Sequence, residues 1–167
     1  MSVILHVWNV RPGNPGHVSL EVGSAYVSYW PNEVAGKRDF KVGATHPPAF
    51  PRSYAMDRRL ERREADAHLT LTGLDEGRIV AAWEQFRRAP ARYNMLRHNC
   101  STVVASLLEI GSGVRPSFSP SIRIDDHVSG PAERFLLRLR FFGSEIRMWT
   151  PDAVQRYALE LQTKGER

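Results

Sequence analysis

Cysteine is nearly absent from this chain, because Cys100 is the single one among 167 residues. One thiol cannot form an intramolecular disulfide, so the fold does not depend on an oxidising compartment. Lysine is also scarce, since only Lys37, Lys41 and Lys164 are present, and arginine therefore supplies most of the net charge of +5. No apolar run approaches the roughly 18–20 residues that a membrane-spanning helix requires.

Short metal-binding spacings are absent too: the sequence holds no HxH, HExxH or CxxC, and its histidines are scattered. We therefore expect no metal and no cofactor. No recognised nucleic-acid-binding motif accompanies the positive charge, so we expect no nucleic-acid partner. Residues 1–9 (MSVILHVWN) lack the basic segment, long apolar stretch and cleavage site of a secretory signal. We expect synthesis in the cytoplasm without a signal peptide, and any export by a signal-independent secretion system.

The composition that remains is that of a single globular domain covering residues 1–167. Apolar residues make up 42% of the chain and charged residues 25%, which are ordinary shares. The first half predicts β-structure, with strands at residues 3–10, 17–22, 25–30 and 67–72. The second and third of these strands are joined by Gly23 and Ser24, which predicts a β-hairpin. The charge run at residues 58–64 (RRLERRE) predicts a solvated helix face or loop.

The second half of the chain predicts helices. Acidic residues at 75 and 76 open one that ends before Pro90. Residues 100–110 carry an apolar stripe at helical spacing, and Gly111 follows where a C-cap glycine belongs. Residues 115–131 predict a loop or lid, and Thr150 with Pro151 predicts the start of a last helix. The pattern as a whole predicts an α+β fold.

Cys100 has the sequence context of a catalytic nucleophile. A thiol in the first turn of a helix feels the positive end of the helix dipole, which favours the reactive thiolate. The free N–H groups of that turn are able to hold an oxyanion. Asn99, the preceding residue, is a candidate helix cap or a further oxyanion donor. The alternative is an inert, buried cysteine, which is the more common use of a lone cysteine in a helix.

A nucleophilic cysteine also needs a base, and six histidines are available: His6, His17, His46, His68, His98 and His127. His17 begins a strand directly after the glycine-containing loop RPGNPG, which fixes a side chain yet leaves it reachable. His68 also starts a strand and is the second candidate. His98 is close to Cys100 in sequence, but near neighbours in an extended segment seldom point at each other.

Two motifs resemble a known family. Residues 16–31, including Gly16, His17 and the strand up to Trp30 and Pro31, are similar to the histidine hairpin of the circularly permuted papain-like enzymes. These form the permuted NlpC/P60 superfamily, which includes the lecithin:retinol acyltransferase-like proteins. Asn99 and Cys100 resemble the opening of their cysteine helix. The resemblance implies a permuted papain-like fold, in which an antiparallel sheet packs against the helix that carries the cysteine.

The group that orients the histidine ring stays open between two residues. In the acyltransferase branch of the family, a second histidine occupies the position that aligns with Tyr29. Hairpin alternation instead places Ser28 on the His17 face of the sheet. We therefore take Ser28 as the orienting residue and Tyr29 as the alternative.

The resemblance implies a cysteine peptidase, amidase or acyltransferase whose substrates are peptides, peptidoglycan, or protein and lipid acyl groups. A small domain of this kind also resembles bacterial effectors and toxins, for which a cognate immunity protein is an expected partner. The alternative is a non-catalytic binding protein of the same fold. It would use arginines at 134, 138 and 140, which interleave with apolar residues, to bind an anionic membrane surface or partner. A core element with solvated arginines explains the same run.

Overall fold

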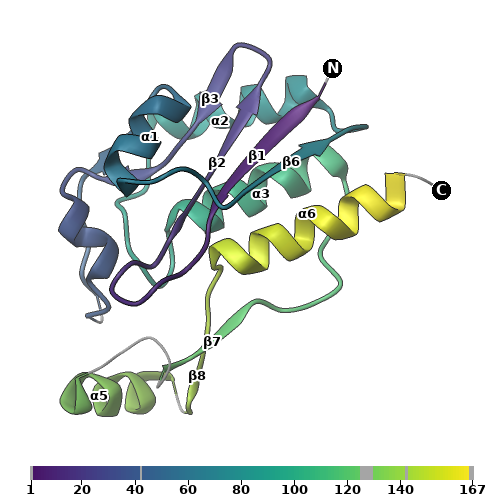
Figure 1. Ribbon diagram of the computed structural model, residues 1–167. Helices are drawn as coiled ribbons and strands as arrows, with labels where there is room; N and C mark the ends of the chain where they lie inside the picture. Colours follow the sequence, from purple (N-terminus) through teal and green to yellow (C-terminus); the bar gives the residue numbers. More distant parts are fainter. Residues whose placement is uncertain (1, 42, 125–129, 142, 166–167) are drawn as a thin grey trace.

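A four-stranded antiparallel sheet forms the centre of the computed structural model, which describes residues 2–41, 43–124, 130–141 and 143–165 (Figure 1). Its strand order is β3-β2-β1-β6. The bounds are β1 (Val3–Trp8), β2 (His17–Val22), β3 (Ala25–Val27) and β6 (Ala67–Leu71). The predicted strands at residues 3–10, 17–22 and 67–72 are confirmed, apart from small shifts at their ends.

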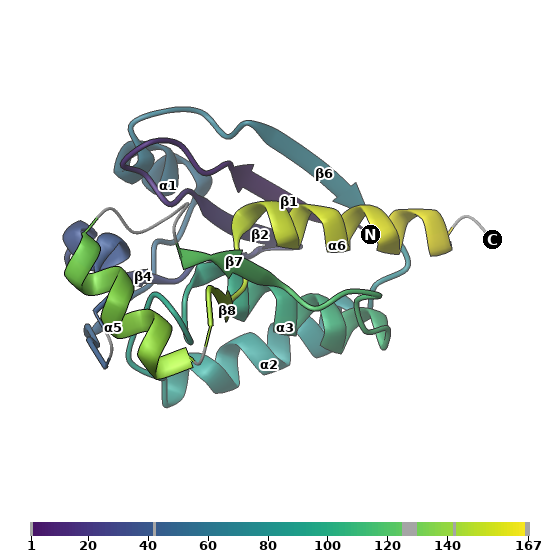
Figure 2. The same cartoon turned by 90° about the horizontal axis from the view of Figure 1, so that it is seen from below.

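The two faces of the sheet differ because side chains alternate along each strand. One face is apolar and fully buried, and it packs on α2 (Glu76–Arg88), α3 (Cys100–Ser112) and α6 (Pro151–Gly165). The other face carries polar side chains such as His6, His17 and Ser19. Figure 2 shows α1 (Tyr54–Glu61) on this side of the sheet, with α2 and α3 on the opposite side. The molecule is therefore a mixed α+β protein, with five α-helices among the described residues.

Helices α2, α3 and α6 begin where the sequence predicted. Asp75 caps α2 by accepting a hydrogen bond from the N–H of Arg78, and Thr150 caps α6 through Ala153. The predicted end of α3 is wrong, because Gly111 lies inside the helix and Gly113 is the left-handed C-cap. A Cβ at Gly111 would lie 2.5 Å from the Ile79 side chain, so this glycine permits close packing of α2 on α3.

The hairpin at residues 17–30 is shorter than predicted. The turn at Gly23 pairs Val22 with Ala25 as expected, but β3 ends at Val27. The chain then leaves β2, and β4 (Trp30–Pro31) pairs with β5 (Pro48–Ala49) after the 3-10 helix η1 (Val34–Arg38). The strand ends here because the side chains of Ser28 and Trp30 both donate hydrogen bonds to a buried carboxylate, that of Asp57.

A smaller unit lies apart from the sheet, at the lower edge of Figure 1. It contains β7 (Ser121–Arg123), β8 (Glu145–Arg147) and α5 (Pro131–Phe141), and the two strands pair antiparallel. The predicted loop or lid at residues 115–131 thus contains a strand, and its residues 125–129 lie outside the described part of the chain. Residues 134–141 form an exposed helix rather than a core element, since only Leu137 of α5 is buried.

Candidate active site

Cys100 is the first residue of α3, and its neighbour Asn99 caps that helix. The Asn99 side-chain oxygen accepts a hydrogen bond of 2.8 Å from the N–H of Thr102. Its amide nitrogen donates to the carbonyl oxygens of Met95, at 2.9 Å, and Trp149, at 3.0 Å. Both amide hydrogens are thus engaged. Asn99 supports the site by holding the helix start in place, and it has no hydrogen left for the predicted oxyanion bond.

The N–H groups at the start of α3 remain as oxyanion donors. The side-chain oxygen of Asn99 accepts a hydrogen bond from the N–H of Thr102. The backbone carbonyl of Asn99 accepts one from the N–H of Val103. The N–H groups of Cys100 and Ser101 have no acceptor among the described residues. They stand at the positive end of the helix dipole, next to the sulfur. An attacked carbonyl oxygen is able to accept hydrogen bonds from them as negative charge develops.

His17 is held at the start of β2 by a tight loop. Gly16, directly before it, has φ +74°, and a Cβ there would lie 2.2 Å from the carbonyl oxygen of Trp8. The Asn14 side chain accepts a hydrogen bond of 2.9 Å from the N–H of Gly16. Only glycine fits this backbone position without displacing its neighbours. The loop therefore fixes where the His17 side chain enters the site.

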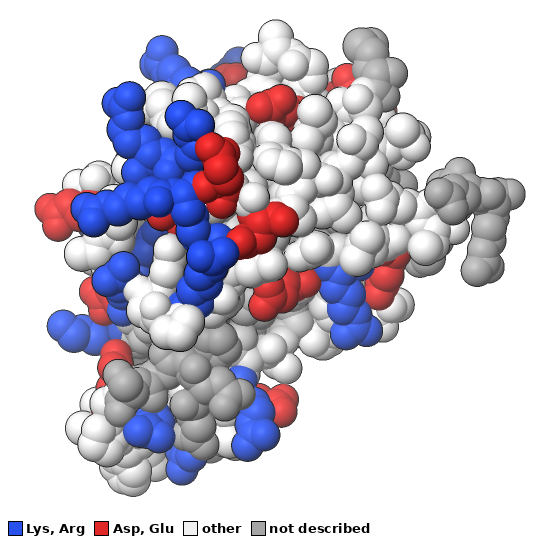
Figure 3. Space-filling view, in the orientation of Figure 1, with Lys and Arg blue, Asp and Glu red and all other residues white. Residues whose placement is uncertain are grey.

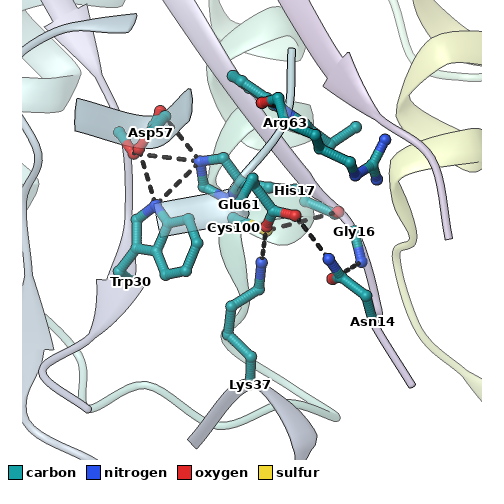
Figure 4. Close-up of polar contacts among 12 residues, drawn as sticks. Asn14, Gly16, His17, Trp30, Lys37, Asp57, Glu61, Arg63 and Cys100 are labelled. Carbon is teal, nitrogen blue, oxygen red and sulfur yellow. Dashed lines mark hydrogen bonds and ion pairs between the residues drawn. The ribbon is translucent and has the colours of Figure 1, made fainter. Parts of the chain in front are cut away.

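Asp57 is the carboxylate that orients the His17 ring. Its Oδ2 lies 3.2 Å from His17 Nε2, and both side chains are fully buried. Tyr26 donates to Oδ2 at 2.7 Å. Ser28 and Trp30 donate to Oδ1 at 2.8 Å and 2.9 Å (Figure 4). Four donors thus surround one buried carboxylate, which is what a buried charge requires.

Burial acts to raise the pKa of Asp57, but the charge of His17 and the hydrogen bonds from His17, Tyr26 and Ser28 lower it overall. Asp57 is therefore ionised at neutral pH. It holds the His17 ring with Nε2 toward the carboxylate, and the other ring nitrogen, Nδ1, is the one available to the thiol.

The two predicted orienting residues have different surroundings. Ser28 Oγ lies 3.1 Å from His17 Nε2, so this side chain does contact the ring, and it also donates to Asp57. Tyr29 lies in the core, where its hydroxyl donates to the carbonyl of Ala91 at 2.8 Å. It makes no hydrogen bond to His17. Ser28 is accordingly a neighbour that orders the carboxylate as well as the ring.

Thiol and imidazole interact directly at the centre of the site. His17 Nδ1 is buried without a well-aligned hydrogen-bond partner among the described residues. The Cys100 thiol interacts with the His17 ring and raises its pKa. Burial acts to raise the pKa of the Cys100 thiol, but the charge of His17 lowers it overall, helped by Lys37 and by a backbone hydrogen bond from Val18. Burial acts to lower the pKa of His17, but Asp57 and Cys100 raise it to about 9. Both shifts favour a thiolate–imidazolium pair.

A second buried pair lies beside this one. Lys37 forms an ion pair with Glu61, and its Nζ lies 4.0 Å from the centre of the Trp30 ring (Figure 4). Glu61 also accepts a hydrogen bond of 2.8 Å from Asn14. The charge run at residues 58–64 is thus not wholly solvated as predicted, since Glu61 points inward to a buried partner. The pair ties α1 and η1 to the loop before His17.

A narrow, mostly apolar recess gives access to the sulfur. It lies between the loop before β2, the start of α3 and the segment between β8 and α6. Its wall contains Val10, Pro15, Gly16, Phe40, Tyr93, Met95, Asn99, Cys100, Ser101, Met148, Trp149, Thr150 and Pro151. The sulfur therefore lies in a largely apolar setting, where charges interact strongly.

The other candidate histidines lie elsewhere. His68 Nδ1 is 2.7 Å from His6 Nδ1, and His46 pairs with Asp39. His98 is exposed, and His127 lies outside the described residues. Among the residues that the structure describes, no group of three or more His, Cys, Asp or Glu side chains is arranged to hold a metal ion. Nor does any described helix have the length and apolar character needed to cross a membrane.

Sequence reasoning did not identify Asp57, although a signal is present. Asp57 and Glu61 are four residues apart, so they share one face of α1. Arginines occupy positions 58, 59, 62 and 63 around them. An acidic pair facing one way within an arginine-rich segment indicates that this face meets buried cationic partners.

Comparison with known proteins gave one match. Residues 49–115 match the family described as the IcsB middle domain. This segment includes Asp57 and Cys100 but not His17. No curated protein and no solved structure matches the chain.

Proposed function

We propose that this chain is a cysteine-dependent hydrolase or transferase that acts on an amide or acyl carbonyl. The observation that supports it is the buried series Cys100, His17 and Asp57, in which each member shifts the pKa of the next toward the charged form. Structural ion pairs also shift pKa values, but here the shifts coincide with a thiol at a helix start and with a narrow recess whose wall includes that thiol.

The chemistry would proceed in two stages. The Cys100 thiolate attacks the carbonyl carbon, and the oxyanion is held by the N–H groups of Cys100 and Ser101. Imidazolium His17 gives its proton to the leaving amine or alcohol as the carbonyl–heteroatom bond breaks, which leaves a thioester. Water or an acceptor amine or alcohol then attacks the thioester carbonyl and loses its proton to His17. The carbon–sulfur bond breaks, which releases the acyl product and restores the Cys100 thiolate. Asp57 stays ionised and stabilises the imidazolium throughout.

A permuted papain-like fold is part of the proposal. The histidine lies on an early strand and the cysteine opens a later helix that packs on the same sheet. The match of residues 49–115 to the IcsB middle domain supports a bacterial effector-like protein. Cell-wall peptides and protein or lipid acyl groups are the substrate classes that we propose.

Alkylation by iodoacetamide tests the proposed catalytic pair without a substrate. Because Cys100 is the single cysteine, the measured rate of thiol alkylation is that of Cys100. The rate measured across pH should follow a thiol pKa below that of ordinary cysteine, which is about 8.5. In a His17→Ala variant the pKa should rise, while His98→Ala should leave it unchanged. A thiol of ordinary pKa, or one that does not respond to His17, would contradict the proposal.

Expression in bacteria tests the substrate class. Wild type and the Cys100→Ala variant would be produced in the cytoplasm and, with an added signal sequence, in the periplasm. Toxicity of the wild type in the periplasm alone would indicate a cell-wall substrate, and toxicity in the cytoplasm would indicate a protein or lipid substrate. Equal toxicity of the Cys100→Ala variant would contradict a thiol-dependent effect.

A further inference from the structure

The helix α5 presents an unpartnered apolar stripe to solvent. Phe135 is 62% exposed, Leu136 59% and Leu139 57%, which makes them the most exposed large apolar side chains among the described residues. Positions i, i+1 and i+4 lie within roughly 100° of arc on a helix of 3.6 residues per turn. The three side chains therefore form one continuous face, opposite the buried Leu137.

Cationic side chains border this stripe. Arg138 and Arg140 lie at its two edges and are exposed. Arg123 and Arg147, on the paired strands β7 and β8, are exposed as well. The lower left of Figure 3, where α5 lies, shows Lys and Arg side chains beside white surface, together with some Asp and Glu side chains. An apolar stripe flanked by arginines is the pattern of a helix that lies in a membrane interface.

We propose that α5 docks this protein on an anionic lipid surface. Phe135, Leu136 and Leu139 enter the boundary between headgroups and acyl chains, while the flanking arginines extend along the helix surface to the phosphates. An open hollow next to the stripe, lined by leucines of α5 with Lys41, Arg140 and Glu133, has a volume of about 750 Å³. It offers further apolar surface to acyl chains, with two cations and one acid among its polar lining.

The apolar stripe distinguishes α5 from the other basic surface of the molecule. The arginines over α1 are also prominent in Figure 3, and several arginines of that surface pair with acids. Arg58 pairs with Glu64 at 2.8 Å, and Arg11 and Arg63 both pair with Asp66. That surface also lacks an apolar stripe of its own. The α5 surface combines both features that bind a peripheral protein to anionic lipids.

The proposed docking surface adjoins the catalytic recess. Met148 and Trp149 directly follow β8 and line that recess. Lys41 lines the hollow beside α5, and its neighbour Phe40 lines the recess at Cys100. Lipid binding does not depend on the thiol chemistry, so it is testable in a Cys100→Ala protein, and its failure would leave the proposed catalytic function standing.

The test is co-sedimentation of the full-length Cys100→Ala protein with lipid vesicles. Vesicles of phosphatidylcholine with phosphatidylserine should bind it, and pure phosphatidylcholine should bind it much more weakly. Changing Phe135, Leu136 and Leu139 together to serine should weaken binding by at least about tenfold, given the apolar area lost. Changing Arg140 and Arg147 together to glutamine should weaken it roughly fivefold for each charge removed.

Matched controls separate the stripe from general surface effects. Leu159→Ser removes a leucine of α6 that is 47% exposed, and Arg115→Gln removes an exposed arginine away from α5. Both should bind vesicles as the parent protein does. Circular dichroism checks that every variant is folded. Absence of binding to anionic vesicles, or equal binding by the triple serine variant, would overturn the proposal. Gel filtration that shows a dimer abolished by the same serine changes would assign the stripe to a second copy instead.

Discussion

The Nε2 atom of His17 lies 3.2 Å from Oδ2 of Asp57, and neither side chain is exposed. This pair has three further donors on its carboxylate side and a thiol on the other side of the ring. An acid buried in this way is costly unless it is fully hydrogen-bonded, which makes the arrangement sensitive to single substitutions.

Asp57→Asn should reduce the reactivity of Cys100. The variant keeps the size of the side chain but removes the negative charge that stabilises imidazolium His17, so the pKa of the thiol should rise. A rise of one pKa unit lowers the thiolate fraction about tenfold at a pH below both values. The measurement is the iodoacetamide rate at neutral pH. Asp39→Asn is the control, because Asp39 lies at the same distance of 3.2 Å from a different histidine, His46. An unchanged rate in Asp57→Asn would remove this carboxylate from the proposed catalytic series.

The His17 ring should stay protonated up to about pH 9. NMR of the ring nitrogens would follow its titration directly. The pKa should fall in Cys100→Ala, which removes the thiolate, and fall in Asp57→Asn, which removes the carboxylate. A His17 pKa near 6.5 in the wild type would show that the three groups are not coupled.

The same shift predicts a pH dependence of stability. The folded pKa of His17 lies above its unfolded value of 6.5, so the fold binds the proton more tightly. Its stabilising contribution should be complete below about pH 6.5 and lost as the pH rises through about 9. Urea unfolding of the wild type, compared with His17→Gln, measures this contribution. In the Cys100→Ala background the loss should begin at a lower pH, because the thiolate no longer raises the pKa of His17. A free-energy difference that grows with rising pH would contradict it.

Lys37→Met should act on both stability and reactivity. It leaves Glu61 as a buried, unpaired charge, which costs about 3–5 kcal/mol in comparable cases. It also removes a cation that lowers the pKa of Cys100. The double variant Lys37→Met with Glu61→Gln should recover most of the stability lost, because no buried charge is left. If the thiol pKa also returned fully to the wild-type value, Lys37 would have no electrostatic role of its own.

Gly16→Ala should disturb the site more than Gly13→Ala. Both glycines have a positive φ, +74° and +73°, so both substitutions carry backbone strain of about 1–2 kcal/mol. At Gly13 the new Cβ would meet nothing within 4 Å, whereas at Gly16 it would collide with the Trp8 carbonyl. Thermal unfolding should show the larger loss for Gly16→Ala, and alkylation should show slower Cys100 chemistry in that variant alone. Equal effects of the two changes would mean that the loop does not position His17.

The sequence by itself determined much of this molecule. Period-two alternation predicted β2 and β6, and an apolar run predicted β1. Acidic first-turn residues predicted the start of α2, and candidate cap residues predicted the starts of α3 and α6. These features are local, because a few neighbouring residues satisfy them. Cys100 at a helix start and His17 after a glycine loop were candidates for the same reason. Their chemical roles stay a prediction until the thiol is titrated.

Only the tertiary structure decided which groups meet. Asp57 is 40 residues from His17, and within its own segment it resembles an ordinary acid in the first turn of a helix. Its role follows from α1 packing over the polar face of the sheet, where Tyr26, Ser28 and Trp30 turn toward it. The early end of β3 and the inward turn of Glu61 have the same cause. A buried charge needs hydrogen-bonding or charged partners, and these come from distant parts of the chain. The local pattern around Asp57 indicates that its face of α1 is buried, but it does not say which residues meet that face.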